Sequence, residues 1–300
     1  MRDLILVGVD LDLDLAAELA EKLAPQSVLT LPGESAVRIC GVADSSDRSV
    51  LKPLLDGHHV DLFDVPEGFS AKRFKILATD LDNTLIENEC IDDMAFAAHR
   101  TREMHAALEL ARAEKCDASE TLRRRVAVLE GADVSSLEYA VQAERFSDGA
   151  EKLVKFAKRL GMPCYVISCG FVQIAAAAVK KLGLSGAVTN ELVIKDGVVT
   201  GEVRGPAGGR LMDSDGKRRT LEILAQLNGC ELDEAIALGD GGNDAGMVAA
   251  AGCGVAYRPK PALCAANPAV VIRHSGLGAV MLLFVEAWTD AFVRSSKAKK

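Results

Sequence analysis

The first 65 residues alternate short apolar runs with polar turns, which predicts four strands and two helices. The runs of strand length are residues 3–9, 27–31, 36–42 and 59–65. The segments with helical spacing are residues 14–24 and 45–57. Read in order, the pattern is strand, helix, strand, strand, helix, strand, which is typical of a ferredoxin-like domain. We therefore expect residues 1–70 to form a small N-terminal accessory domain.

From Phe74 onward the pattern predicts strands that alternate with helices. Strand-like runs occur at 74–80, 164–170, 235–241 and 252–257, with amphipathic segments between them. This alternation predicts a Rossmann-like, doubly wound parallel sheet for residues 71–300. Residues 91–146 carry only helical signals, so we expect a helical cap, about 88–147, inserted after the first strand. Such a cap would lie over the carboxyl ends of the strands, where these sheets bind ligands.

Composition narrows the classes of function. The formal net charge of −8 argues against a broad nucleic-acid surface. The longest apolar segment near the end, residues 279–292, is interrupted by Glu286 and Asp290 and is too short to span a membrane. No signal peptide is recognisable, and the eight cysteines show no metal-binding spacing. We expect a cytoplasmic protein with reduced thiols.

Polar residues follow three of the predicted core strands, and a lysine opens a helix between the last two. The residues are Asp80, Asp82, Thr84, Ser168, Cys169, Gly170, Asp240, Asn243 and Asp244, with Lys217 as the lysine. Strand ends of a parallel sheet converge at one edge, so these side chains should lie together. Four carboxylates need a cation, and hard oxygen ligands suit Mg²⁺. A magnesium ion, a lysine and glycine-flanked amides are suited to a phosphoryl group.

A second acidic string, "VGVDLDLDL", resembles the segment with Asp80 and Asp82 only in the spacing of its aspartates. No Thr or Ser follows its aspartates at the required position, because Asp14 stands there. We expect Asp10, Asp12 and Asp14 to form a solvated turn that caps the following helix.

One ordered set of motifs resembles the haloacid-dehalogenase-like phosphatases, and within them the phosphoserine phosphatases. It consists of "DLDNTLIENECID", "ETLRRRVAVL", "ISCGF", "NELVIKDGVVTGEV", Lys217 and "GDGGNDAGMVAAAGCGVAY…KP". The resemblance covers residues 74 to about 285. It implies that Asp80 is the nucleophile and forms an aspartyl-phosphate, and that Asp82 is the general acid and base. It also implies that Asp80, the backbone carbonyl of Asp82 and Asp240 bind Mg²⁺.

The resemblance assigns further roles around the phosphoryl group. It implies that Lys217 offsets negative charge and that Asp244 orients Lys217. Ser168 and the amide of Gly170, with Cys169 between them, would bind phosphoryl oxygens. Asn243 would help to position these oxygens, and Thr84 would support the loop geometry.

Two residues of the predicted cap are implied in the choice of substrate. Glu89 matches the acid near the substrate ammonium, and Arg125 matches the arginine that pairs with the substrate carboxylate. The implied reaction is hydrolysis of O-phospho-L-serine to L-serine and phosphate, the last step of serine biosynthesis. The small-molecule ester is the expected partner, and a homodimer is left open.

Several residues depart from the family pattern. Asn83, Cys169 and Gly242 stand where Ser, Gly and Ala are usual, and Ala118 stands where the cap usually has an aromatic residue. The Ala118 position leaves open another small phosphate ester, or an alcohol acceptor in place of water. The N-terminal segment is similar in topology to ACT-like domains, so an amino-acid-sensing regulatory protein with weak catalysis is the alternative from a different class.

Overall fold

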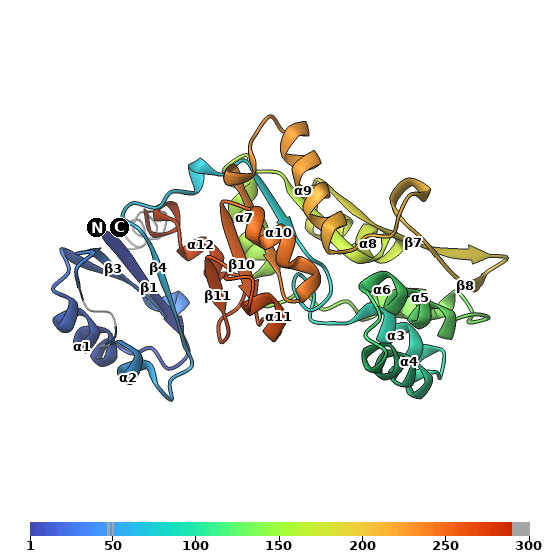
Figure 1. The fold of residues 1–300 in the computed structure, drawn as a ribbon. Helices are drawn as coiled ribbons and strands as arrows, with labels where there is room; N and C mark the ends of the chain where they lie inside the picture. Colours follow the sequence, from blue (N-terminus) through green and yellow to red (C-terminus); the bar gives the residue numbers. More distant parts are fainter. Residues whose placement is uncertain (47–48, 50, 290–300) are drawn as a thin grey trace, which may run out of the picture. The chain divides into compact units, whose positions relative to one another are not determined.

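The computed structural model describes residues 1–46, 49 and 51–289, and the chain divides into two compact units. Unit 1 comprises Met1–Arg73, Asp148–Phe156 and the chain from Val270 onward. Unit 2 comprises Phe74–Ser147 and Ala157–Ala269. Figure 1 shows the chain coloured from the N-terminus in blue to the C-terminal part in red.

Unit 1 begins with the predicted order of strands and helices. The elements are β1 (Arg2–Gly8), α1 (Leu13–Leu23), β2 (Ser27–Leu31), β3 (Ala36–Val42), α2 (Leu51–Leu55) and β4 (Val60–Pro66). The strands form an antiparallel sheet in the order β2-β3-β1-β4. Alternate apolar residues of the sheet, such as Leu4, Leu6 and Ile39, pack with Leu19 and Leu23 of α1. The βαββαβ topology of this small extra domain is therefore confirmed.

Two later segments of the chain also belong to unit 1. The second contains β11 (Val270–Ile272) and α12 (Ala279–Leu282), and β11 packs beside β4. The buried carboxylate of Asp61 accepts backbone N–H groups from Arg273, His274 and Ser275. Buried Arg38 donates to Asp3 and to the carbonyl oxygen of Leu283. Charged groups of the N-terminal sheet thus bind the chain after residue 270.

Unit 2 contains the parallel sheet. Its strands are β5 (Ile76–Thr79), β6 (Cys164–Phe171), β7 (Gly186–Lys195), β8 (Val198–Arg204), β9 (Ala235–Gly239) and β10 (Cys253–Tyr257). They lie in the order β10-β9-β5-β6-β7-β8, parallel as far as β7, and β8 runs antiparallel to β7. The chain continues from β5 to β6 on one side and returns to β9 on the other. This reversal of strand order beside β5 is the position where such sheets bind ligands.

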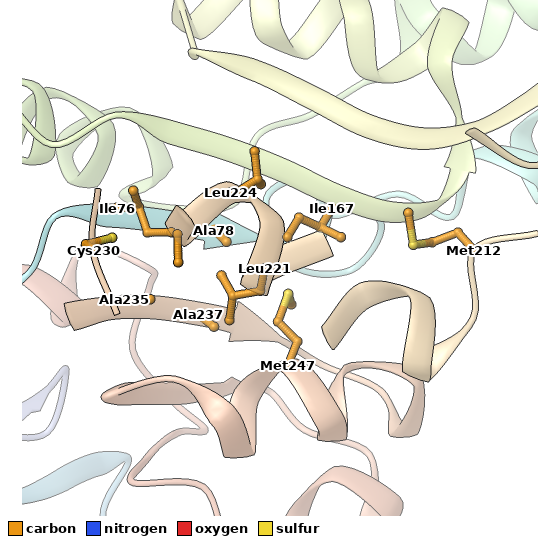
Figure 2. Packing of buried hydrophobic residues seen from close by; sticks show 11 residues of the cluster. Ile76, Ala78, Ile167, Met212, Leu221, Leu224, Cys230, Ala235, Ala237 and Met247 are labelled. Carbon is orange, nitrogen blue, oxygen red and sulfur yellow. The ribbon is translucent and has the colours of Figure 1, made fainter. Parts of the chain in front are cut away.

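Helices between the strands complete the α/β unit. They are α7 (Ala150–Arg159), α8 (Val172–Leu182), α9 (Ser214–Leu227), α10 (Ala245–Ala250) and α11 (Pro261–Cys264), of which α7 begins in the Asp148–Phe156 segment. Figure 2 shows Leu221 of α9 beside Ala237 of β9, with Met247 of α10 next to them. Alanines on the strands allow the helix to approach the sheet closely, as in Figure 2, where Ala78 and Ala235 lie in the same cluster.

The helical insertion after β5 forms the cap. It contains α3 (Cys90–Ala97), α4 (Thr101–Ala113), α5 (Ala118–Val128) and α6 (Ser135–Ala143).

None of the helices in the described part of the chain has the length and apolar character that a membrane span requires.

Candidate active site

The end of β5 places Asp80 beside a buried lysine. The backbone N–H of Asp80 donates to Leu238 of β9 (2.9 Å), which fixes the residue at the sheet edge. Its Oδ1 accepts the Leu81 N–H (2.7 Å) and lies 2.8 Å from Lys217 Nζ. Lys217 Nζ also donates to Asp244 Oδ1 (2.6 Å). The first turn of α9 therefore supplies one cation that two carboxylates share.

Lys217 is charged in this environment. Its side chain is 0% exposed, and burial alone would lower its pKa. The negative charges of Asp244 and Asp80 outweigh this effect and hold the pKa of Lys217 above its ordinary value. The ammonium group consequently stabilises both carboxylates at neutral pH.

The turn after β9 brings Asp240 and Asp244 to the same point. Asp244 Oδ2 accepts the N–H groups of Asp240 (3.1 Å) and Gly241 (2.9 Å). A Cβ at Gly239 would lie 2.3 Å from Asp244 Cγ, so only glycine fits there. One carboxylate oxygen from each of Asp80, Asp240 and Asp244 lies within 4.8 Å of the others.

The donor set of this cluster fits a hard divalent cation. Its side-chain donors are carboxylate oxygens, and no Cys or His side chain belongs to the cluster found among the described residues. Asp244 already accepts bonds from Lys217 and two backbone amides, which leaves Asp80 and Asp240 to face a metal ion. Mg²⁺ prefers such oxygen ligands and accepts one or two carboxylates with water and substrate oxygens.

Asp82 contacts the start of the cap and the end of β6. Its Oδ1 accepts the Cys90 N–H at the start of α3 (2.9 Å). A Cβ added at Gly170 would lie 3.1 Å from Asp82 Oδ2 and 3.3 Å from Ser168 Oγ, so these oxygens face one small space. Burial, assisted by the charge of Glu89, raises the pKa of Asp82 to about 7. Asp82 can therefore hold or release a proton near neutral pH.

The end of β6 supplies hydrogen-bond donors at the same place. Ser168 Oγ accepts the Gly170 N–H (3.0 Å), and Asn243 Nδ2 donates to Cys169 Sγ (3.7 Å). The Cys169 carbonyl accepts from Asn190 Nδ2 of β7 (2.8 Å), which fixes the turn. Burial raises the pKa of the Cys169 thiol to about 11, so the thiol is neutral and packs against Asn243.

The cap brings Glu89 and Arg125 together. Glu89 directly precedes α3, and its carboxylate accepts from Arg125 Nη1 (2.9 Å) and from Asn83 Nδ2 (2.8 Å). Arg125 Nη2 donates to Asp92 (2.7 Å), while among the described residues its Nε has no partner. Asn83 has φ +57°, a left-handed conformation that asparagine tolerates better than most residues. The turn after β5 thus places the side chain of Asn83 within hydrogen-bonding distance of Glu89.

A cavity of about 370 Å³ joins these groups. It is lined by Asp80, Asp82, Asn83, Glu89, Arg125, Ser168, Cys169, Gly170, Asp240 and Asn243, among others. Lys217 and Asp244 are fully buried and do not line the cavity. Thr84 also lies outside the lining. Thr84 is fully buried, and its carbonyl oxygen accepts from Ser147 Oγ (2.6 Å). Thr84 is therefore separated from the cavity, and its expected part in the site stays a prediction.

Two charged residues of the site had no role in the sequence prediction. Lys260 lines the cavity and contacts Asp240 Oδ2 (2.8 Å), and Asp92 holds Arg125. The sequence signal for Lys260 is the Lys-Pro pair that starts α11 after β10, and the signal for Asp92 is its place one turn into α3. Neither signal specifies a contact, because both contacts join segments far apart in the chain.

The second acidic string behaves as a helix cap. Asp12 Oδ1 accepts the Leu15 N–H (2.8 Å) at the start of α1. Asp10 accepts from the backbone N–H of His59 (2.8 Å) and pairs with its ring. The predicted helix cap is confirmed at Asp12, whereas Asp14 lies in the first turn of α1 and not in the preceding turn.

A family model of the haloacid dehalogenase-like hydrolases matches residues 77–249. The chain belongs to this family. The match begins in β5 and ends in α10, so it includes the cap and the three strand ends of the site. The family prediction from the motif set is confirmed.

Three curated relatives are phosphoserine phosphatases. That of Polaromonas sp. is 38% identical over 213 residues, which cover 70% of this chain and 89% of the relative. Phosphoserine phosphatase SerB2 of Mycobacterium tuberculosis is 34% identical over 68% of this chain and 49% of its own length. That of Streptomyces coelicolor is 37% identical over 83% of this chain and 57% of its own length. The chain thus spans about half the length of the last two relatives.

Two solved structures are similar. A phosphoserine phosphatase described as a phospho-aspartyl intermediate analogue has a TM-score of 0.64 and 31% identity over 70% of this chain and 99% of its own. A haloacid dehalogenase family hydrolase of Salmonella enterica serovar Typhi has a TM-score of 0.82 and 24% identity over 95% of this chain and 99% of its own. The second likeness shows a shared fold.

Proposed function

We propose that this protein is a magnesium-dependent phosphatase that hydrolyses O-phospho-L-serine through an aspartyl-phosphate. The observation that carries the proposal is the lining of the cavity. Asp80, Asp82 and Ser168 lie along it with Glu89 and Arg125, so one ligand can meet phosphoryl-binding and amino-acid-binding groups together. The similarity to phosphoserine phosphatases of three bacteria supports the same substrate.

Asp80 is the nucleophile in this proposal. Its Oδ1 is held by the Leu81 N–H and Lys217, which leaves Oδ2 to attack phosphorus. The new P–O bond forms as the bond between phosphorus and the serine oxygen breaks. Water then attacks phosphorus, the P–O bond to Asp80 breaks, and phosphate leaves. The solved relative described as a phospho-aspartyl intermediate analogue supports this course.

Asp82 moves the proton in both steps. It donates to the leaving serine oxygen in the first step and accepts from the attacking water in the second. A pKa of about 7 suits both tasks, because neither protonation state is strongly disfavoured near neutral pH. Asp80 and Asp82 thus have different environments and different roles.

The remaining groups bind the phosphoryl oxygens. Ser168, the Gly170 amide and Asn243 would donate to them, in the space that a Cβ at Gly170 would fill. Mg²⁺ held by Asp80, Asp240 and the Asp82 carbonyl would neutralise phosphoryl charge.

The ion pair in the cap matches the two charges of the amino acid. In this proposal Glu89 accepts from the substrate ammonium and Arg125 donates to the substrate carboxylate. Asp92 continues to hold Arg125 Nη2, so the guanidinium keeps its orientation while Glu89 is released. The substrate therefore replaces one ion pair by two.

Ala118 supports a second candidate, which is a bulkier phosphate ester or an alcohol acceptor in place of water. This exposed residue, at the first position of α5, lines the cavity and leaves space that an aromatic side chain would occupy. A panel of small phosphate esters, measured with and without added alcohols, separates the candidates. We expect phosphoserine among the best substrates by kcat/KM, with activity abolished by a chelator.

The matched variants are Asp80→Asn and Asp12→Asn. Asp80→Asn should lower kcat by at least about a thousandfold, because the amide is a poor nucleophile. Asp12→Asn should keep full activity, because asparagine caps helices as well as aspartate. Retained turnover in Asp80→Asn would refute the assignment of Asp80 as the nucleophile. A poor kcat/KM for phosphoserine would refute the assignment of the substrate.

A further inference from the structure

Lys260 is a second cation at the carboxylate cluster, and the proposed reaction gives it no role. Its Nζ lies 2.8 Å from Asp240 Oδ2. Its backbone N–H donates to the Asp240 carbonyl oxygen, also at 2.8 Å. Pro261 follows at the start of α11, so the backbone is fixed beside the end of β9 while the side chain extends into the cavity.

The two lysines of the cluster differ in how easily their ammonium groups can be displaced from the carboxylates. Lys217 is 0% exposed and bridges Asp80 and Asp244, so its departure would leave two buried carboxylates without a cation. Lys260 has a side chain that is 60% exposed, and its ammonium group forms an ion pair with one carboxylate of the cluster, that of Asp240. A flexible, exposed lysine loses little when it exchanges one carboxylate for water.

Lys260 and a divalent metal ion need the same carboxylate. The Asp240 side chain is only 6% exposed, and Asp80 and Asp244 lie close to it. A metal ion held by Asp240 would bring two further positive charges next to the ammonium group, and like charges at such separations repel strongly. Asp240 therefore cannot bind the metal ion and the Lys260 ammonium group together without losing affinity for one of them.

We propose that Lys260 neutralises Asp240 in the metal-free protein, and that a divalent metal ion displaces its ammonium group. Lys260 then lowers the metal affinity of the site while it keeps the empty carboxylate cluster stable. The proposal rests on the metal ligands of the proposed function but does not depend on the substrate.

Calorimetric titration with Mg²⁺, without substrate, tests the competition. Lys260→Met should bind Mg²⁺ about tenfold more tightly than the wild type, within the usual range of coupling between competing ligands. Lys195→Met removes the same charge from an exposed position at the end of β7 and should stay within about twofold of the wild type. Unchanged or weaker binding in Lys260→Met, or no binding in any of the proteins, overturns the proposal.

Thermal unfolding gives a second readout that does not use activity. In chelator, Lys260→Met should unfold at a lower temperature than the wild type, and saturating Mg²⁺ should remove the difference. Lys260→Gln serves in the same way if the methionine variant does not fold. An equal decrease in the unfolding temperature of Lys260→Met with and without Mg²⁺ would contradict the displacement of the Lys260 ammonium group by the metal ion.

A crystal structure with Mg²⁺ tests the contact itself. We expect Lys260 Nζ to lie beyond hydrogen-bonding distance of Asp240 Oδ2, and an unchanged contact would overturn the proposal. A protein that passes these tests but does not hydrolyse phosphoserine would refute the proposed function alone.

Discussion

At the scale of single residues, Lys217 and Asp82 lie in contrasting electrostatic environments. Lys217 is locked between Asp80 and Asp244, and its raised pKa keeps it protonated. Asp82 accepts the Cys90 N–H, and the charges of Glu89 and Asp80 act on it from nearby. Burial therefore acts on Asp82 with little compensation, and its proton becomes exchangeable near pH 7.

This difference predicts how stability depends on pH. Folded Asp82 keeps its proton up to about pH 7, whereas in the unfolded chain the carboxyl group loses it near 3.8. Between these values the folded state binds more protons, so the free energy of unfolding falls as pH rises. Asp82→Asn removes this dependence. Between pH 5 and pH 8 we expect the free energy of unfolding of the variant to rise by about 2–3 kcal/mol relative to that of the wild type.

Urea unfolding in chelator at pH 5 and pH 8 measures the effect. Glu87→Gln changes an exposed carboxylate of the same loop and should follow the wild-type slope. A wild type whose stability rises relative to Asp82→Asn over this range would contradict the raised pKa of Asp82.

At the scale of elements, the ends of strands and the starts of helices position the chemistry. Asp80 and Asp240 follow β5 and β9 directly, and Ser168 lies within strand β6, three residues before its end. Lys217 stands at the fourth position of α9, after the N-cap residue Asp213. The Asp213 side chain accepts the Gly216 N–H (2.7 Å), and its carbonyl accepts the Lys217 N–H (2.8 Å). The first turn of α9 therefore fixes the origin of the Lys217 side chain.

Removing this cap should affect both stability and turnover. Asp213→Ala should lower the free energy of unfolding by about 1 kcal/mol and should also lower kcat, because Lys217 loses its fixed origin. Asp12→Ala removes the equivalent cap of α1 and should cost about the same stability. We expect Asp12→Ala to leave kcat unchanged. Equal kcat in the two variants would show that the α9 cap has no part in positioning Lys217.

The elements themselves were largely predictable. The βαββαβ order, the alternating strands and helices and the helical cap all follow from hydrophobic spacing, which is set by the local chain. The antiparallel direction of β8 follows from the tight turn at Asp196 and Gly197, both with positive φ.

At the scale of the whole molecule, buried carboxylates tie distant segments together. Asp61 of β4 accepts three backbone N–H groups more than 200 residues away, at Arg273, His274 and Ser275. The expected boundary at residue 70 remains a proposal. The structure adds to residues 1–73 two later segments, which a fragment of residues 1–70 would lack.

Asp61 predicts a large effect on stability from one side chain. Asp61→Ala leaves three N–H groups without their acceptor and should lower the free energy of unfolding by about 2–3 kcal/mol. Asp64→Ala, in the same strand, removes a half-exposed pair with Arg2 and should cost less than about 1 kcal/mol. Denaturant titration of both variants measures the difference. Similar losses in the two would contradict the role of Asp61.

Hydrophobic spacing and the order of the motifs were enough to predict the elements, the family and many of the residues that line the cavity. Spacing along the chain sets secondary structure, and the acidic, serine and lysine motifs stand at strand ends and helix starts that a parallel sheet brings together. Only the tertiary structure decided which charges meet. The pairing of Lys260 with Asp240, the hold of Asp92 on Arg125 and the anchoring by Asp61 join residues from different elements. Such contacts depend on how elements pack, and no local pattern of residues encodes that packing.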